Sequence, residues 1–231
     1  MKFNIFDGII DFINENNKQS LDSTEEIKRL QTEIKALQNQ IQNASKETTT
    51  TRINESHNFS KEFLDKISSL KETKDFASVY KFFEELSSEG NREMISKACE
   101  EGLWKKTTDY ENNVLHVASM EENLNLVKLL IECGCDKEAK DVFGYTPLIW
   151  ASSFGHLEVV KYLISIGADK EAKDVFGYTP LIWASSFGHL EVVKYLISIG
   201  ADKDAKSNDG KTALSYAKSN VRDFLISIGA K

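Results

Sequence analysis

A 33-residue sequence that occurs twice in succession constrains the fold of this chain more than any other feature. Residues 141–173 (DVFGYTPLIWASSFGHLEVVKYLISIGADKEAK) are followed by residues 174–206, which differ from them only by aspartate in place of one glutamate. The same frame extends at lower identity to residues 108–140 and 207–231. A fixed period of this length is typical of a solenoid, in which each unit buries its apolar surface against its neighbours.

Within one unit, a turn and a first helix are predicted from residues with distinct conformational roles. Gly144 permits the positive φ that closes a tight turn after Asp141. Thr146 is predicted to cap a short helix that begins at Pro147, where the missing N–H of proline costs nothing. Gly155 is predicted to end this helix in the left-handed conformation.

A second helix in each unit is predicted from apolar spacing. Apolar residues recur three and four apart, which is the spacing of one buried helical stripe, at Leu157, Val160, Leu163 and Ile164. Gly167 follows and is expected to end the helix. Neither helix could bury its apolar face alone, so neighbouring units must supply the rest of the core.

These residues resemble the ankyrin repeat. The shared features are the 33-residue period and three motifs, at Asp141–Leu148, Gly155–His156 and Gly167–Asp169. The resemblance implies an all-α solenoid of helix pairs joined by short β-hairpin turns. It implies four repeats, at residues 108–140, 141–173, 174–206 and 207–231.

One position departs from the family pattern. The histidine that the family carries after Thr-Pro-Leu is replaced by Ile149 and Ile182, and only His116 retains it. We therefore expect a hydrogen bond of the family to be missing from the two middle repeats.

The region before the repeats is predicted to be a helical cap. Over residues 59–107, helical spacing predicts helices at 75–90 and 92–106. The run Ala98–Leu103 matches the pattern of Ala151–Leu157, which suggests a degenerate terminal repeat. The last repeat lacks about four residues between its helices, and its polar residues suit the opposite end of a solenoid.

The segment that precedes this cap has a different organisation. Residues 46–58 are polar and aperiodic and are interpreted as a linker. Residues 1–45 are predicted to hold helices with a short coiled coil, whose core positions are Ile27, Leu30, Ile34, Leu37 and Ile41. This choice of side chains favours a parallel homodimer through residues 27–44, although the pattern lasts only about two and a half heptads.

The composition excludes two classes of partner. The chain has 41% hydrophobic residues, 28% charged residues and a net charge of −7. Nucleic-acid binding depends on neutralising phosphates with Lys and Arg, and no basic face offsets this acidic balance, so we expect no nucleic-acid partner. No stretch approaches the roughly 20 apolar residues that span a bilayer, so we expect no membrane partner.

The cysteines and the N-terminus indicate a cytoplasmic protein, with the nucleus as the alternative. Three cysteines are an odd number and do not form a disulfide framework. Polar residues from Asn4 to Asp11 interrupt any signal-peptide core. Cys133 and Cys135 replace residues expected in packed positions, and we interpret them as small buried hydrophobes, since a structural zinc site needs four ligands.

No motif indicates catalysis. Gly210–Thr212 resembles the end of a phosphate-binding loop, but Ala205 stands where that loop needs glycine. His156 and His189 have no nucleophile or carboxylate in triad spacing and are expected to hydrogen-bond between repeats. We therefore expect no enzyme activity, no cofactor and no metal. An enzyme would need an unrecognised site in the N-terminal segment that precedes the repeats, where His57 is the one histidine.

The family resemblance implies that a partner protein docks on the hairpin tips and the exposed face of the first helices. Carried over to this chain, the partner-binding residues are Val142, Phe143, Tyr145, Trp150, Phe154, Val175, Phe176, Tyr178, Trp183 and Phe187. Turn tips are ordinarily polar, so the Val-Phe pair at each tip is unexpected. The hypothesis is an adaptor or scaffold that binds a protein through an aromatic stripe on one concave face.

Three alternatives remain open. The tryptophans could belong partly to the core. The phenylalanines could cover a neighbouring turn or the N-terminal helices. The chain could also be a structural protein that assembles through its coiled coil and uses the repeats as a spacer.

Overall fold

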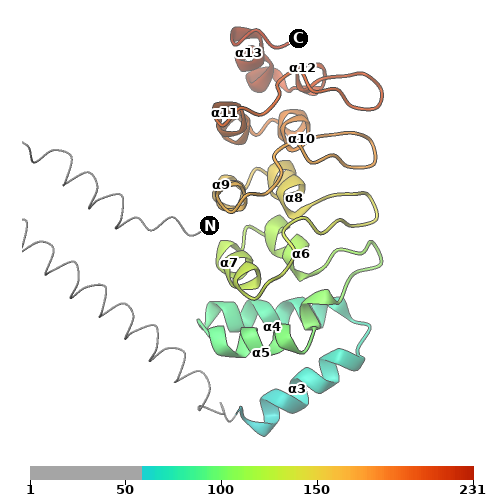
Figure 1. Cartoon of the computed structure of the whole chain (residues 1–231), viewed down its shortest axis with the longest axis vertical. Helices are drawn as coiled ribbons and strands as arrows, with labels where there is room; N and C mark the ends of the chain where they lie inside the picture. Colours follow the sequence, from blue (N-terminus) through green and yellow to red (C-terminus); the bar gives the residue numbers. More distant parts are fainter. Residues whose placement is uncertain (1–58) are drawn as a thin grey trace, which may run out of the picture. The chain divides into compact units, whose positions relative to one another are not determined.

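The computed structural model describes residues 59–231, which form a stack of helix pairs (Figure 1). The helices are α3 (Lys61–Glu72), α4 (Phe76–Ser88), α5 (Arg92–Glu100), α6 (Val114–Met120), α7 (Leu124–Glu132), α8 (Pro147–Phe154), α9 (Leu157–Ser165), α10 (Pro180–Phe187), α11 (Leu190–Ser198), α12 (Ala213–Tyr216) and α13 (Ser219–Ser227), with a 3-10 turn η2 (Leu103–Lys105). Between residues 59 and 231 the only β pairing is an isolated bridge of Thr107 with Asn113. The all-α prediction is confirmed.

The predictions for residues 1–58 lie outside the described part of the chain. They comprise the helices of residues 1–45, the linker of residues 46–58 and the coiled-coil positions from Ile27 to Ile41. Within the described part, no helix is long and apolar enough to cross a membrane.

Each repeat begins as its sequence predicts. The Oγ1 of Thr146 accepts a hydrogen bond from the backbone N–H of Ile149 at 3.3 Å, and Pro147 is the first residue of α8. Gly155 has a φ of 83° and ends α8, and Gly144 has a φ of 78°. Since α10 repeats these features, the two middle repeats have the same local structure.

The second helix buries a slightly different stripe from the predicted one. Val160 and Leu163 are fully buried, as expected, and Val159 is fully buried as well. Leu157 and Ile164 are half-buried and pack against the edge of the core. Each lies within one residue of an end of α9, where fewer neighbouring side chains cover the helix.

The helices stack in two columns (Figure 1). α6, α8, α10 and α12 form one column, α7, α9, α11 and α13 form the other, and the loops between repeats project on the side of the first column. Histidines bond across the stack, with His156 Nε2 at 2.7 Å from the carbonyl of Met120 and His189 Nε2 at 2.8 Å from that of Ser153. The predicted role of these histidines between repeats is confirmed.

The cap preceding the first full repeat is itself a helix pair, in which α4 and the start of α5 lie where the sequence predicts them. α4 and α5 pack on each other, and Gly90, with a φ of 73°, separates them as Gly155 separates α8 from α9. α5 ends at Glu100 and not at residue 106, because Gly102 turns the backbone into the left-handed region. The match of Ala98–Leu103 to the end of a first helix is therefore wrong, since Gly102 follows a second helix.

The last repeat is shortened at the predicted place. α12 has only four residues, and α13 begins three residues after it. Thr212 is the N-cap of α12 and donates its backbone N–H to Ser215 Oγ at 3.3 Å. Gly210–Thr212 therefore forms a turn and a helix cap, as its place in the repeat predicts.

Candidate functional site

In the two middle repeats, the loop tips present apolar side chains because a buried aspartate organises the loop from inside. Asp141 Oδ1 accepts hydrogen bonds at 2.9 Å from the backbone N–H groups of both Phe143 and Tyr145. The carboxylate is thus occupied by the chain around it, and Val142 and Phe143 are left exposed at the tip. Asp174 makes the same two bonds in the next repeat.

Neighbouring tips are held in register by backbone hydrogen bonds. The N–H of Val142 donates to the carbonyl of Tyr110 at 3.1 Å, and the N–H of Val175 donates to the carbonyl of Phe143 at 2.9 Å. In a third bond, the backbone N–H of Asn208 donates to the carbonyl of Phe176 at 2.9 Å. Four successive loops are therefore tied together along the stack.

The tryptophans join the first helices to these loops. Trp150 Nε1 donates to Asp141 Oδ2 at 3.1 Å, and Trp183 Nε1 donates to Asp174 Oδ2 at 2.9 Å. Both indoles are half-buried. Neither indole packs against the hydrophobic core of residues 59–231, and each one instead fixes its loop while exposing part of its ring.

In each middle repeat, four rings form a row from the loop tip to the end of the first helix. In the first row, ring centroids are 6.0 Å apart for Phe143 and Tyr145, 4.9 Å for Tyr145 and Trp150, and 6.0 Å for Trp150 and Phe154. The second row repeats the arrangement with Phe176, Tyr178, Trp183 and Phe187. We call these eight rings, with Val142 and Val175, the aromatic face.

The two rows are joined into one surface. Tyr145 lies with its ring centroid 5.3 Å from that of Trp183 in the next repeat. Burial raises the pKa of the Tyr145 hydroxyl to about 12, so this group stays neutral under ordinary conditions. The structure thus brings together all ten residues that the sequence marked for partner binding.

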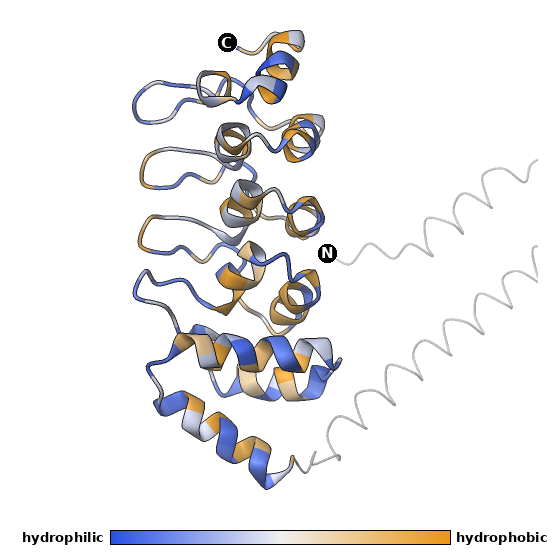
Figure 2. Ribbon diagram, turned by 180° about the vertical axis from the view of Figure 1, so that it is seen from behind, coloured by the Kyte–Doolittle hydropathy of each residue, from blue (hydrophilic) through white to orange (hydrophobic). Residues whose placement is uncertain are grey.

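Most of the large hydrophobic side chains that are exposed lie at this place. Nine large hydrophobic residues between positions 59 and 231 are exposed, and seven of them belong to the aromatic face or adjoin it. These seven are 39–59% exposed: Tyr110, Val142, Phe143, Phe154, Val175, Phe176 and Phe187. Figure 2 shows the loops of the two middle repeats coloured as hydrophobic at their tips, and those of the first and last repeats as hydrophilic. The four phenylalanines remain 39–52% exposed, although the ring of Phe143 lies against Tyr110 of the preceding loop.

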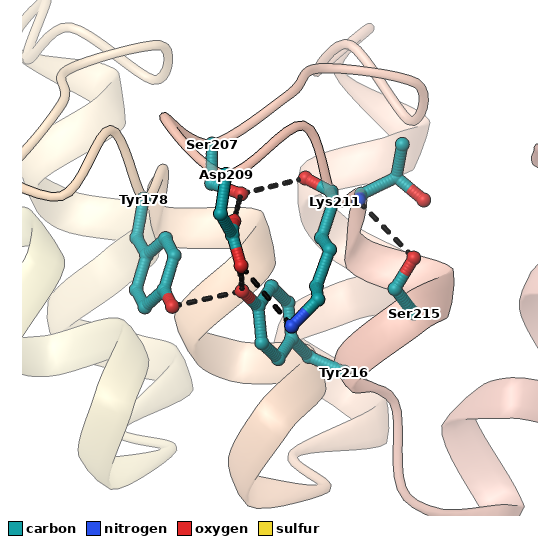
Figure 3. Close-up of polar contacts among 7 residues, drawn as sticks. Tyr178, Ser207, Asp209, Lys211, Ser215 and Tyr216 are labelled. Carbon is teal, nitrogen blue, oxygen red and sulfur yellow. Dashed lines mark hydrogen bonds and ion pairs between the residues drawn. The ribbon is translucent and has the colours of Figure 1, made fainter.

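A polar cluster borders the aromatic face in the last repeat (Figure 3). The hydroxyls of Tyr178 and Tyr216 are 2.8 Å apart, and the Tyr216 hydroxyl donates to Asp209 Oδ2 at 2.9 Å. Lys211 Nζ lies 3.1 Å from the same carboxylate oxygen. Hydrogen bonds from Ser207 and Tyr216 lower the pKa of the Asp209 carboxyl. The hydrogen bond between the Tyr216 and Tyr178 hydroxyls raises the pKa of Tyr216. This border is therefore fixed and charged.

Comparison with known families identifies the repeats. The family described as ankyrin repeats (three copies) matches residues 84–174 and again residues 167–231, which is well over half of the chain. The chain is an ankyrin-repeat protein. Ankyrin repeats typically mediate protein–protein interactions, and the family is usually non-catalytic.

One curated ankyrin protein shares a short segment with this chain. Ankyrin repeat and SOCS box protein 3 of Homo sapiens is 49% identical over 43 residues. The similarity covers 19% of this chain and only 8% of that protein's length.

The first repeat keeps the histidine that the family carries near the start of the first helix, whereas the two middle repeats have isoleucine there. His116 is fully buried, accepts a bond from the backbone N–H of Asn113 at 3.1 Å and lies 2.8 Å from the carbonyl of Ala139. Ile149 and Ile182 occupy the same position and are also buried. The middle ankyrin repeats therefore exchange a polar link for apolar packing, as expected.

Two rings at the edges of the aromatic face were not predicted from the sequence. Tyr110 lies 5.8 Å from Phe143, and Tyr216 lies 5.1 Å from Tyr178, between ring centroids. Each stands one repeat length from an aromatic residue of a middle repeat, Phe143 and Trp183 respectively. The repeat frame therefore carried the signal that could have found them.

The three cysteines lie together away from the aromatic face. Cys99 on α5 interacts with Cys133 and Cys135, which follow α7. The Cys133 hydrogen bond alone would lower the pKa of Cys99, but the Cys135 bond and burial outweigh it and raise that pKa to about 12. Cys135 is buried as predicted, whereas Cys133 is half-buried. In the described region, no three metal-binding side chains are placed to hold an ion.

Proposed function

We propose that this protein is a non-enzymatic adaptor or scaffold that binds another protein on the aromatic face. The observation that carries the proposal is the gathering of seven exposed apolar side chains, including four phenylalanines, on one surface. A contiguous exposed apolar patch is typical of an interaction site in a protein of this size. Aromatic residues are also enriched among the side chains that contribute most to binding.

The rigidity of the face supports the same function. The rings contact one another, and the Trp–Asp bonds and the bonds between loops fix the backbone beneath them. Because these side chains are already ordered, docking a partner costs little conformational entropy on this side of the interface. The face therefore suits binding without rearrangement.

The test is affinity capture from the lysate of the protein's own cells. The bait is the full chain, beside a variant in which Phe143, Phe154, Phe176 and Phe187 are changed to Ala. A matched control is Ile226→Ala, since Ile226 is similarly exposed but lies on α13. We expect a partner that the wild type and the control retain and the four-fold variant loses, with circular dichroism showing that all three are folded. Equal capture by all three would exclude the aromatic face.

The spacing of the N-terminal segment favours a second candidate function, self-assembly. Ile27, Ile34 and Ile41 are seven residues apart, and Leu30 and Leu37 alternate with them, as in a coiled-coil seam. Light scattering on the full chain and on an Ile34→Lys, Leu37→Lys variant tests it. A dimer that dissociates in the variant supports assembly, and a monomer in both would leave docking as the function.

A further inference from the structure

The spacing of the aromatic face restricts the kind of segment that can lie along it. α8 packs directly on α10, and packed helices lie about 8–10 Å apart. Residues related by the repeat, such as Phe143 and Phe176 or Phe154 and Phe187, therefore recur along the stack at about that distance. A matching partner must present apolar side chains on one side at the same interval.

Two regular conformations meet this requirement. Residues seven apart in an α-helix lie on one face and are separated by about 10.5 Å. Residues three apart in a polyproline II helix share a face at about 9.3 Å. An extended strand does not fit, because its same-face residues are separated by about 6.6 Å or about 13 Å.

The chemistry of the face favours the α-helix. A polyproline II helix makes no internal hydrogen bonds, so its backbone needs donors from the surface that it covers. The indole N–H groups of Trp150 and Trp183 already donate to aspartates, and the Tyr178 hydroxyl is paired with Tyr216. The exposed atoms of Val and Phe offer no donors, and the hydroxyls of Tyr110 and Tyr145 are too few to satisfy the backbone of a whole segment. An α-helix satisfies its own backbone and can bury an apolar side against such a surface.

The border in the first repeat adds a preference for positive charge. Asp109 and Glu121 are exposed and stand one repeat length before Val142 and Phe154, so they continue the face with acidic side chains. Neither is in an ion pair with another residue of the described stack. A Lys or Arg on the partner would therefore gain Coulomb attraction at this end without displacing an existing pair.

We infer that the partner segment is an amphipathic α-helix that lies along the stack. Its apolar residues are spaced about seven apart and cover the two rows of rings, and a basic residue lies over Asp109 and Glu121. The inference rests on the proposed docking function and specifies the conformation and charge of the docked segment.

Selection from a display library of random 20-residue peptides, with the full chain as bait, tests the inference. We expect enriched peptides with apolar residues at positions i, i+3 or i+4, and i+7, and with Lys or Arg near one end. A synthetic copy should become helical on binding. Its affinity should fall about tenfold or more with Phe143→Ala, Phe176→Ala, since central aromatic side chains are among those whose truncation weakens an interface most.

A second variant, Asp109→Asn with Glu121→Gln, keeps the rings and removes the charges. We expect it to weaken the same peptide a few-fold and to reduce the dependence of binding on salt. Unchanged affinity and salt dependence would remove the charge preference.

The remaining outcomes separate the two proposals. Enriched peptides that are proline-rich or alternate in polarity, yet depend on Phe143 and Phe176, would overturn the helix and leave docking intact. Self-association of the chain that competes with the peptide would identify a second copy as the occupant. Enrichment that ignores the phenylalanine variant, or no enrichment, would overturn docking on this face.

Discussion

Two serines are buried in the first helices of the middle repeats without a hydrogen-bond partner. Ser152 and Ser185 are fully buried, and the Oγ of each has no partner among residues 59–231. Ser119 occupies the same position in the first repeat and donates its hydroxyl to the carbonyl of Leu115 at 2.9 Å. An unpaired buried hydroxyl loses its hydration without compensation, so the middle repeats carry a cost that the first repeat avoids.

Ser152→Ala should therefore stabilise the protein, by about 1 kcal/mol in the free energy of unfolding. Ser119→Ala is the matched control and should be neutral or slightly destabilising, because it removes a hydroxyl that is paired. Urea unfolding of both variants beside the wild type measures the difference. A loss of stability on Ser152→Ala would mean that the hydroxyl has a partner, such as a bound water.

The buried imidazole of His116 makes stability depend on pH. Burial lowers the pKa of His116 below its ordinary 6.5, so the folded protein holds the ring neutral where the unfolded chain takes up a proton. This stability is fully present above the pKa of the unfolded chain and is lost as the pH falls from there through the lower pKa of the folded protein. Carboxylates with lowered pKa values are ionised in both states in this range and do not contribute.

His116→Ile tests this dependence with the side chain that the middle repeats carry at the same position. Between about pH 7.5 and about pH 5.5, the urea midpoint of the wild type should fall more than that of the variant. The other three histidines are present in both proteins, so their effects on the urea midpoint cancel in the comparison. Parallel decreases would show that His116 does not titrate on unfolding.

At the scale of the helices, the glycine between the two helices of a repeat serves two purposes. Gly155 has a φ of 83°, and a Cβ at this position would lie within 2.7 Å of the Cγ of His189 in the next repeat. Gly167 has a φ of 80° but no atom within 4 Å of the same point. The first glycine therefore allows both a left-handed turn and the close approach of a neighbouring repeat.

Gly155→Ala should destabilise the protein more than Gly167→Ala. The control measures the cost of the positive φ alone, about 1–2 kcal/mol. Gly155→Ala adds displacement of the His189 ring, which bonds to the carbonyl of Ser153. We expect at least about 1 kcal/mol beyond the control by urea unfolding. Equal effects would mean that the ring moves aside freely.

The ends of a helix could be predicted from the sequence where the residues at those ends each have a single conformational role. Thr146, Pro147 and Gly155 predicted both ends of α8, because an N-cap, a first-turn proline and a left-handed glycine are local requirements. The end of α5 could not be predicted in this way, since glycine follows both helices of a repeat. The run Ala98–Leu103 therefore matched the end of a first helix, although Gly102 follows the second helix of the cap.

The candidate site was predictable as a set of residues but not as a surface. The frame of the repeats placed all ten residues on loops and first helices. The bonds of Trp150 and Trp183 to buried aspartates depend on how the loop folds back on the helix, and the spacing does not show them. Glu111 and Glu122 adopt positive φ where other repeats have glycine, and nothing in their side chains indicates it.

For the molecule as a whole, the near-identity of the two middle repeats makes one of them removable. After deletion of residues 141–173, residues 174–206 would meet the first repeat with the same side chains that meet it now. The variant should fold cooperatively, with a lower midpoint and an m-value reduced by roughly a fifth, because less surface is exposed on unfolding. It should also bind a partner more weakly, since only one row of rings remains.

Deletion of residues 108–140 is the control of equal length. It would place a middle repeat against α4 and α5 and remove the bond from Asn125 to the carbonyl of Ser87 and the ion pair of Arg92 with Glu132. We expect a larger loss of stability than in the first deletion. Equal stability of the two shortened chains would show that the contacts between repeats are interchangeable throughout the stack.

The placement of the indoles gives the protein a built-in optical signal. Two of its three tryptophans, Trp150 and Trp183, lie beside the exposed rings of Phe154 and Phe187, with centroids 6.0 Å and 5.7 Å apart. The third, Trp104, belongs to η2. In a Trp104→Phe background, all tryptophan emission would come from the aromatic face. Exclusion of water by a docked segment would then shift the emission to shorter wavelength, and binding could be followed without a label.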